Sequence, residues 1–428
     1  MKNFLLANAL IFLSLSSIAQ TYQFGNGKWL INKKFDSKTV YAQNGKFVFQ
    51  KPAIIDSVIN LNNKYCIPPF GDAHTHNLDG TYGLQDMIMK YLKEGVFYIQ
   101  VLGNNGQGAV NSRPVLARTP LDVQFANGLL TSTYGHGFYP YEPMAMGIYA
   151  PYQQIMYADS IKKSRIVENK AYFFLDSIAE VDKKWDLIMS YKPDLIKIVL
   201  NDAKNYITKR KIEKPDDNGL SEEVATYIVK KAHQQGFRVY AHIETADDAR
   251  LCAKIGVDAL AHLPGYGWNG KEESKSKYCI DKEDIKNFKK ANLTIIPTFN
   301  YDGTKTYDLN GNETINIESY NASIEYKTWA LKHMKKANIP IGIGADSYGS
   351  TVIPEIDALI KNRVYSNREL IDIYSKSTPQ LIFPLRKIGE IKEGYEASFI
   401  VLEENPLKNI ESIKSIGLKI KQGVILNN

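Results

Sequence analysis

The sequence predicts a (β/α)8 barrel together with a small β-sandwich domain that is built from both ends of the chain. The chain has 428 residues, which is enough for a barrel of about 250 residues and a smaller unit. Its middle alternates apolar runs of strand length with helix-like segments, and both ends are rich in short strands. A hydrophobic fraction of 44% and a charged fraction of 23% are those of a globular protein and exclude a disordered or low-complexity chain.

The first nineteen residues have the features of a secretory signal. Lys2 supplies a basic start, an apolar stretch runs from Phe4 to Leu15, and the small residues Ser17 and Ala19 follow. We therefore expect cleavage near Ala19 and a secreted or periplasmic protein. No later run reaches the roughly 18 apolar residues of a membrane span, so we expect no membrane insertion.

Short strands with polar turns fill residues 20–64, including a predicted hairpin at Asn44 and Gly45, and a similar pattern returns in residues 386–428. Because the two ends of a barrel lie close in space, we expect these segments to form one composite β-domain. The predicted boundaries are therefore a signal segment at 1–19, β-domain parts at 20–64 and 386–428, and the barrel at 65–385.

Eight apolar runs in the barrel region are candidate parallel strands. They are residues 65–73, 95–102, 122–131, 194–200, 237–242, 259–262, 292–297 and 339–344. Helix-like segments at 84–95, 221–236, 246–256 and 323–340 precede the second, fifth, sixth and eighth of them. In such a barrel the functional side chains gather at the carboxyl ends of the strands.

The first candidate strand ends in His74 and His76, which are two residues apart and so share one face of the strand. This pair suits metal chelation, although two histidines alone also fit a chance occurrence. Lys197 lies within an apolar strand, where an unpaired ammonium is costly. It either extends its ammonium to the strand end or reacts with carbon dioxide to give a carboxylate that bridges two metal ions.

Further polar residues close three other strands. His242 ends the fifth, His262 the sixth and Asp346 the eighth. Three cysteines in the chain are too few and too scattered for a disulfide framework or a thiolate zinc site, so a metal here uses histidine and carboxylate ligands. The six candidate ligands are enough for two divalent ions, with zinc, manganese, cobalt and iron as possible metals.

This ordered set resembles the amidohydrolase superfamily of metal-dependent TIM-barrel hydrolases, and within it the imidazolonepropionase-related and prolidase-like dipeptidases. Residues 389–407 resemble the superfamily's C-terminal segment, except that Ser398 replaces the usual aspartate. The resemblance implies zinc as the first choice of metal and a hydroxide between two ions. It also implies the roles of individual residues: His74, His76 and Asp346 on the more buried ion, His242 and His262 on the more exposed ion, a bridging carboxylated Lys197, and Asp346 as general base and acid.

Two residues are candidates for substrate contacts. His136 lies between two glycines, and similar proteins have a substrate-contacting histidine there; it also fits a loop histidine that caps a turn. Tyr240 shares the inward face of His242 and fits either a substrate hydrogen bond or plain packing. Long segments after His136 and after Asn300 fit either lids over the site or ordered surface loops.

The predicted reaction is hydrolysis of a C–N amide bond in a dipeptide or an N-acyl amino acid. Ester, lactone or phosphotriester hydrolysis, cyclic amide or amidine hydrolysis, deamination and a non-catalytic ligand-binding barrel stay open as alternatives. Deamination is disfavoured because Glu244 follows His242 by two residues, where deaminases of this fold often have a glutamate at three. The net charge of +7 is spread along the chain, so we expect a small-molecule partner and no nucleic acid, with the oligomeric state open.

Overall fold

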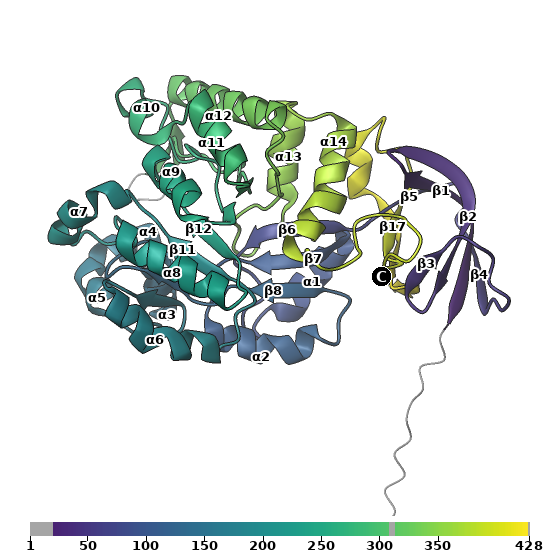
Figure 1. The fold of residues 1–428 in the computed structure, drawn as a ribbon, viewed down its shortest axis with the longest axis horizontal. Coiled ribbons are helices and arrows are strands. Elements are labelled where there is room, and N and C mark those ends of the chain that lie inside the picture. Colours follow the sequence, from purple (N-terminus) through teal and green to yellow (C-terminus); the bar gives the residue numbers. More distant parts are fainter. Residues whose placement is uncertain (1–19, 308–312, 427–428) are drawn as a thin grey trace, which may run out of the picture.

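A computed structural model describes residues 20–307 and 313–426 and shows a mixed α/β fold (Figure 1). The predicted signal segment, residues 1–19, lies outside the described residues. A membrane-crossing helix, which needs both length and apolarity, is absent from the part of the chain that the structure describes.

Parallel strands in the middle of the chain follow one another in space as they do in sequence. They are β6 (Phe70–Thr75), β7 (Val96–Val101), β8 (Asp122–Phe125), β9 (Leu129–Thr131), β11 (Ile196–Val199), β12 (Val239–His242), β13 (Ala259–Leu260) and β14 (Thr294–Ile295). Hydrogen bonds connect these strands in two sets. The first set has the order β6-β7-β8, and the second has the order β9-β11-β12-β13-β14. The two sets meet where the Asp194 N–H donates to the Phe125 carbonyl at 2.9 Å.

The eighth predicted strand, residues 339–344, forms single bridges instead of a regular strand. Ile341 pairs with Ile295 of β14, and the Ile343 carbonyl accepts from the Ala73 N–H of β6 at 2.8 Å. Pro340 has no N–H to donate, and Gly344 lies so close to His74 that a regular ladder does not form. The hydrogen-bonded contacts nevertheless return to β6, so the strands form a ring.

Helices surround this ring, and the four predicted ones are present. They are α1 (Leu84–Lys93), α8 (Glu222–Gln234), α9 (Ala246–Ile255) and α12 (Ile317–Lys336). The helices that were not predicted include α2 (Gly106–Leu116), α6 (Ile178–Ser190), α11 (Lys282–Lys290), α13 (Ile353–Asn362), α14 (Asn367–Asp372) and α15 (Thr378–Ile382), with a π-helical turn at Ile373–Ser377. Helix α2 escaped prediction because glycines and Pro114 interrupt its apolar pattern.

The two long segments predicted as loops contain regular structure. The segment after His136 folds into α3 (Phe138–Ala145), α4 (Pro151–Met156) and α5 (Ala158–Lys163), and β10 (Tyr172–Phe174) then pairs with β9. After Asn300 the chain forms a hairpin of β15 (Lys305–Tyr307) and β16 (Glu313–Ile315), and 308–312 lie outside the described residues. The remaining short helices are α7 (Tyr206–Ile212), α10 (Glu272–Tyr278) and the 3₁₀ turns Ala203–Asn205 and Ile410–Lys414.

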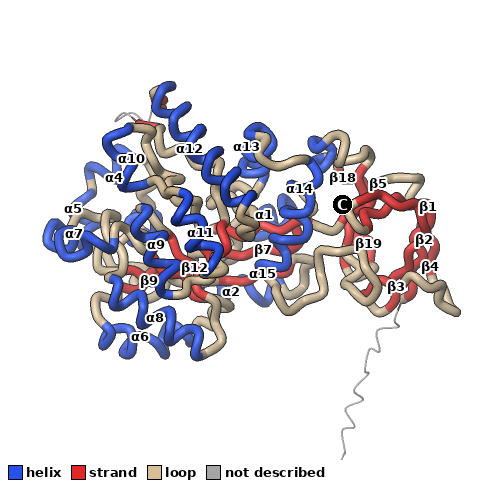
Figure 2. Tube along the Cα trace, turned by 45° about the horizontal axis from the view of Figure 1, so that its top comes forward, coloured by secondary structure: helices blue, strands red, loops and turns tan. Residues whose placement is uncertain are grey.

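The two ends of the chain form one sheet, which we call the terminal sheet; it lies at one end of the molecule (Figures 1 and 2). Its hydrogen-bonded order is β19 (Val424–Leu426), β18 (Ile416–Lys421), β17 (Phe399–Leu402), β5 (Tyr65–Ile67), β1 (Thr21–Ile31), β2 (Lys34–Gln43) and β3 (Lys46–Val48), with β4 (Ser57–Asn60) also beside β1. A continuous sheet stands where the sequence predicted a sandwich. The reason is that β5 pairs with β1 on one side and with β17 on the other, so the strands of the two chain ends belong to one hydrogen-bonded sheet.

Strand β5 also moves the boundary between the two parts of the fold. Residues 65–67 were assigned to the first barrel strand, but they pair with β1 and β17 in the terminal sheet. Pro68 and Pro69 interrupt hydrogen bonding before β6 begins at Phe70. An aromatic cluster of Phe24, Trp29 and Phe399, with ring centroids 4.8–6.4 Å apart, fills the core of the terminal sheet.

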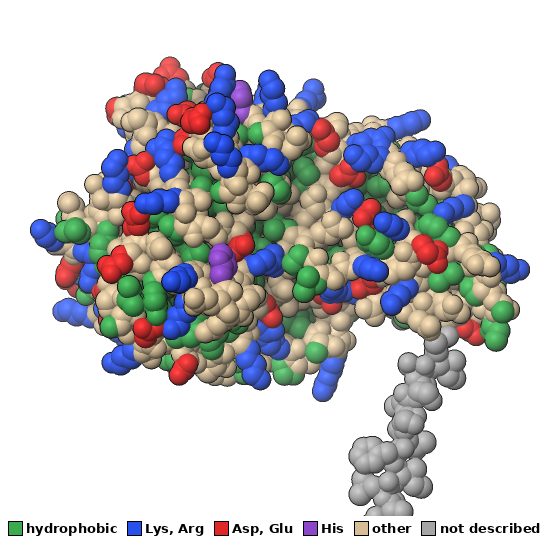
Figure 3. Space-filling model, viewed as in Figure 1, with side chains coloured by type: hydrophobic (Ala, Val, Ile, Leu, Met, Phe, Trp, Pro, Cys, Tyr) green, Lys and Arg blue, Asp and Glu red, His purple; other side chains and the backbone are tan. Residues whose placement is uncertain are grey.

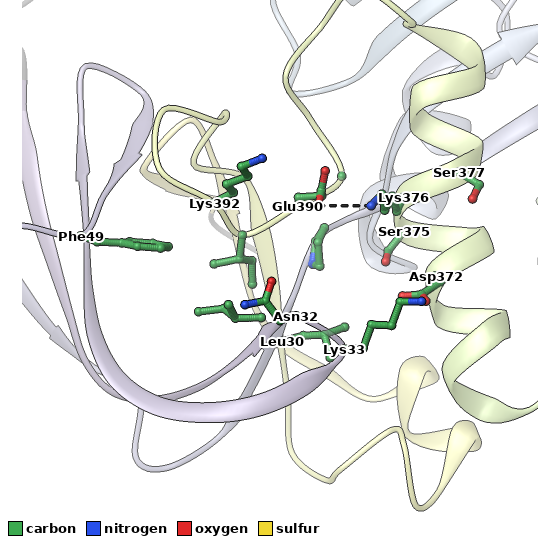
Figure 4. Close-up of a pocket in the computed structure, with 14 residues that line it drawn as sticks. Leu30, Asn32, Lys33, Phe49, Asp372, Ser375, Lys376, Ser377, Glu390 and Lys392 are labelled. Carbon is green, nitrogen blue, oxygen red and sulfur yellow. Dashed lines mark ion pairs between the residues drawn. The ribbon is translucent and has the colours of Figure 1, made fainter.

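A cleft of about 510 Å³ separates the terminal sheet from α14 and the π-helical turn (Figure 4). Its charged side chains have both signs, and Lys376 pairs with Glu390 at 3.2 Å. Pro68 lines the cleft at the amino end of β6, so the cleft lies away from the histidines at the other end of that strand. Positive and negative side chains are likewise intermixed on the face shown in Figure 3.

Candidate metal centre

Strand β6 and the eighth segment place His74, His76 and Asp346 together. The Nε2 atoms of His74 and His76 lie 3.1 Å and 2.7 Å from Oδ1 of Asp346. The Asp346 N–H donates to the His74 carbonyl at 2.8 Å, and a left-handed backbone at Asp346 (φ 55°) turns its side chain toward the histidines. His74 is 1% exposed, so this half of the site is buried.

His242 and His262, at the ends of β12 and β13, form the second half of the site. Nδ1 of His242 lies 2.9 Å from Nε2 of His262, and both side chains are buried. Nε2 of His262 lies 4.0 Å from Oδ2 of Asp346. One ligand atom each of His74, His262 and Asp346 falls within 4.8 Å of the others, so the two halves adjoin and could hold metal.

The remaining nitrogen of each of these four histidines meets an oxygen outside the centre. Nδ1 of His74 donates to the Ala261 carbonyl (2.9 Å) and Nδ1 of His76 to the Gly103 carbonyl (2.8 Å). Because a carbonyl can only accept, the proton sits on Nδ1 and the Nε2 lone pair faces the centre. Such outer hydrogen bonds accompany metal-ligating histidines. The other two outer contacts are His262 Nδ1 with Thr298 Oγ1 (2.9 Å) and His242 Nε2 with Glu244 Oε1 (3.0 Å).

The electrostatics fit a cation at this centre. Burial lowers the pKa of His74 to about 4 and holds the pKa values of His242 and His262 well below the usual range. Burial opposes ionisation of Asp346, but the adjacent His74 and His76 outweigh it and hold the Asp346 pKa well below its usual value. A neutral His74 therefore turns a lone pair toward a carboxylate oxygen at 3.1 Å, and two facing acceptors are stabilised by a cation between them.

Lys197 lies on β11 and is 2% exposed. Burial lowers the pKa of its ammonium to about 7, and within the described ranges no hydrogen bond or ion pair reaches it. At pH 7 about half of such lysines are free amines, which is the form that reacts as a nucleophile.

The structure brings His136 to the site and directs the Tyr240 hydroxyl elsewhere. The His136 ring stacks on His242 with centroids 4.0 Å apart, and Nδ1 pairs with Asp216 at 3.0 Å. Burial opposes protonation of His136, but Asp216 overrides it and raises the pKa to about 9. The Tyr240 hydroxyl instead accepts from Arg238 at 2.9 Å, because Tyr240 lies two residues deeper along β12 than His242.

Several residues of the site were not identified from the sequence. Tyr266 stacks on His262 with centroids 4.1 Å apart, and Tyr348 stacks on His76 at 4.6 Å. Tyr266 follows His262 by four residues and Tyr348 follows Asp346 by two, but both lie in irregular loops, where no helix or strand period predicts the direction of a side chain. Glu244 had a usable signal, since a residue two beyond His242 on an extended chain shares its face.

Comparisons with known proteins identify the family of this chain. Residues 65–425 match the model of the amidohydrolase family. An ochratoxinase of Aspergillus niger is 25% identical over 211 residues, which are 46% of this chain and 39% of that protein. The chain thus aligns with about two fifths of that curated relative's length.

Solved structures show the same fold. The A. niger ochratoxinase structure has a TM-score of 0.70 at 18% identity and covers 95% of both chains. A Xaa-Pro dipeptidase with methionine bound in its active site has a TM-score of 0.69 at 15% identity, covering 96% of this chain and 100% of that one. The family resemblance drawn from the sequence is confirmed: this chain belongs to the amidohydrolase family.

Proposed function

We propose that this protein is an exported, binuclear-metal hydrolase that cleaves the amide bond of a dipeptide or an N-acyl amino acid. The observation that carries the proposal is the lone pair of neutral His74 facing the Asp346 carboxylate at 3.1 Å, which calls for a cation. The ring of parallel strands supports a (β/α)8 barrel, and the terminal sheet supports a composite β-domain beside it.

The six residues predicted as ligands divide into two sets in this proposal. His74, His76 and Asp346 hold the more buried ion, and His242 and His262 hold the more exposed one. The free amine of Lys197 would add to carbon dioxide and release a proton, and the resulting carbamate would be a ligand shared by the two ions; the burial of Lys197, which leaves its amine about half neutral at pH 7, supports this step. Divalent ions, zinc first and manganese, cobalt or iron as alternatives, supply Lewis-acid activation of water and of the substrate carbonyl.

Asp346 moves the proton. Its Oδ1 lies 3.1 Å from Nε2 of His74 and 2.7 Å from Nε2 of His76, whereas Oδ2 lies 4.0 Å from Nε2 of His262. We assign to Oδ2 the proton of the attacking water and its transfer to the leaving amine. The same carboxylate thus serves as base first and as acid afterwards.

His136 supports a substrate that carries an oxygen anion. With Asp216 beside it, its imidazolium lies at the mouth of the site against His242 and can bind a carboxylate or a developing oxyanion. The structural neighbours named ochratoxinase and Xaa-Pro dipeptidase support a peptide-like amide. The basic and apolar start of the chain supports export.

The test is an assay of metal-loaded protein against dipeptides, N-acyl amino acids and matched esters, with release of primary amine or alcohol as the readout. We expect amide hydrolysis by the wild type and by Glu283→Gln, a control that removes an exposed carboxylate on α11. Asp346→Asn should release almost no amine. Turnover of esters alone would place the protein among ester hydrolases and overturn the proposed substrate class.

A further inference from the structure

One charged group meets the histidine pair from outside the centre. Glu244 follows β12, and its Oε1 lies 3.0 Å from Nε2 of His242. The hydroxyl of Tyr266 donates to the same oxygen at 2.9 Å. Among the four outer contacts of the ligand histidines, the other three involve neutral oxygens, two from carbonyls and one from a threonine hydroxyl.

We propose that Glu244 is a positioning residue for the second metal ion. It holds the proton of His242 on Nε2, so that Nδ1 faces His262, and it places a negative charge behind this histidine pair. The inference rests on the proposed function, in which His242 and His262 hold the second ion.

The hydrogen-bond chemistry supports the first part. The Glu244 oxygen already accepts from the Tyr266 hydroxyl, so His242 donates to it from Nε2, which leaves the lone pair on Nδ1. That lone pair points at Nε2 of His262, 2.9 Å away. Tyr266, which donates to Glu244, also stacks on the His262 ring. Glu244 therefore contacts His242 directly and His262 through Tyr266.

The charges around His242 support the second part. The His136 imidazolium lies against the His242 ring with centroids 4.0 Å apart. A cation at this distance opposes the binding of another cation. Asp216 offsets it from the far side, and Glu244 offsets it from the His242 side. With a neutral residue at position 244, less negative charge would offset the repulsion between the His136 imidazolium and the second ion.

The backbone at Glu244 is fixed independently of its side chain. Asp248 accepts from the N–H groups of Glu244 (3.3 Å) and Thr245 (2.9 Å), and Thr245 caps α9. Asp248 also accepts from the N–H groups of Asp202 and Ala203, which fastens this turn to the chain after β11. Glu244→Gln should therefore keep the fold and change the charge.

The test measures ion binding to the full chain, with zinc titrated against a competing chelator and without an activity readout. The wild type and Glu283→Gln should bind two ions. Glu244→Gln should bind the first ion as the wild type does and the second 10- to 100-fold more weakly. Tyr266→Phe, which keeps the carboxylate on His242, should retain the second ion within about threefold, since it removes only one hydrogen bond.

A second measurement locates the ring proton of His242 directly, and it tests the inference even if Glu244→Gln does not fold. Histidine-selective ¹⁵N labelling of metal-free wild type should show His242 protonated on Nε2. Protonation on Nδ1, or equal affinity of Glu244→Gln and wild type for the second ion, overturns the inference. One ion in the wild type would instead refute the binuclear site of the proposed function and, with it, this role of Glu244.

Discussion

The two carboxylate oxygens of Asp346 face different halves of the site. A left-handed backbone conformation directs its Oδ1 toward two histidines and leaves Oδ2 toward the second half of the site. An aspartate tolerates this conformation better than most residues do. The position at the end of the eighth segment was evident from the sequence, but the division between the two oxygens needs the distances.

Asp346→Asn should lower kcat for amide hydrolysis by roughly 10³-fold, because an amide cannot take up the proton of the attacking water. Steady-state kinetics on a metal-loaded sample measure this. A variant with kcat within tenfold of the wild type would mean that another group moves the proton.

The sequence predicted each ligand histidine because each closes an apolar strand, where a polar residue is conspicuous. Tyr266 and Thr298 lack such a signal, since their roles follow from the loops that bring them to His262. Tyr240 shows the limit of periodicity, which assigned the correct face of β12 but did not show that its hydroxyl reaches Arg238.

At the scale of elements, the eighth segment depends on a close approach. A Cβ atom at Gly344 would lie 2.4 Å from the backbone nitrogen of His74 and 2.6 Å from the His74 Cβ, so only glycine fits without a backbone shift. This contact places the eighth segment against His74 of β6.

Gly344→Ala should destabilise the protein by about 3 kcal/mol, since the added methyl must displace backbone in a packed region. Urea unfolding measures the change. Gly25→Ala is the matched control, because its Cβ has no neighbour nearer than 4.0 Å and should cost little. Equal stabilities of the two variants would contradict the assigned packing.

Side chains of α12 and α13 form hydrogen bonds with the backbone of the segment that follows β14. Lys327, 1% exposed, donates to the carbonyls of Phe299 (3.2 Å) and Tyr301 (2.7 Å). Glu355, fully buried, accepts from the Asn300 N–H at 2.8 Å. The Asn300 side-chain amide in turn donates to the Ala345 carbonyl (3.2 Å), next to Asp346.

Burial raises the pKa of Glu355 to about 7. The folded protein then binds more protons than the unfolded chain between pH 4.5 and 7, so this group's stabilisation falls as the pH rises through that window. Relative to Glu355→Gln, the wild type should lose roughly 2 kcal/mol between pH 5 and pH 7. Urea unfolding of both proteins at the two pH values checks this; a constant difference would show that Glu355 titrates normally.

At the scale of the molecule, a cluster of charges joins the terminal sheet to the ring of strands. Glu396, just before β17, accepts from Lys421 of β18 at 2.9 Å and pairs with Arg386. Lys421 and Arg386 both reach Asp122 of β8. Ser398, where the superfamily usually has an aspartate, donates to Glu396 at 2.6 Å.

Burial opposes ionisation of Glu396, but Lys421 and Ser398 outweigh it and lower the pKa to about 2. Glu396→Gln leaves two cations sharing Asp122 and should destabilise the fold by about 3 kcal/mol, with metal content unchanged because the cluster lies away from the histidines. Ser398→Ala, which removes one hydrogen bond, should cost about 1 kcal/mol. If Glu396→Gln had the same stability in urea as the wild type, the cluster would not stabilise the contact between the terminal sheet and the ring of strands.

The sequence predicted a composite β-domain because both ends are rich in strands with no helices to cover them. It could not predict one continuous sheet, because this sheet depends on residues 65–67 leaving the first barrel strand to pair with both β1 and β17. Strand β10 was missed because it is only three residues long, although it pairs with all three residues of β9.

The most direct test of the central claim is the metal content of the mature protein, measured by plasma mass spectrometry after expression with zinc and bicarbonate, beside Lys197→Ala. The account predicts close to two ions per chain in the wild type and fewer in Lys197→Ala, because the bridge between the ions is lost. One ion per chain, unchanged in Lys197→Ala, would contradict the binuclear centre.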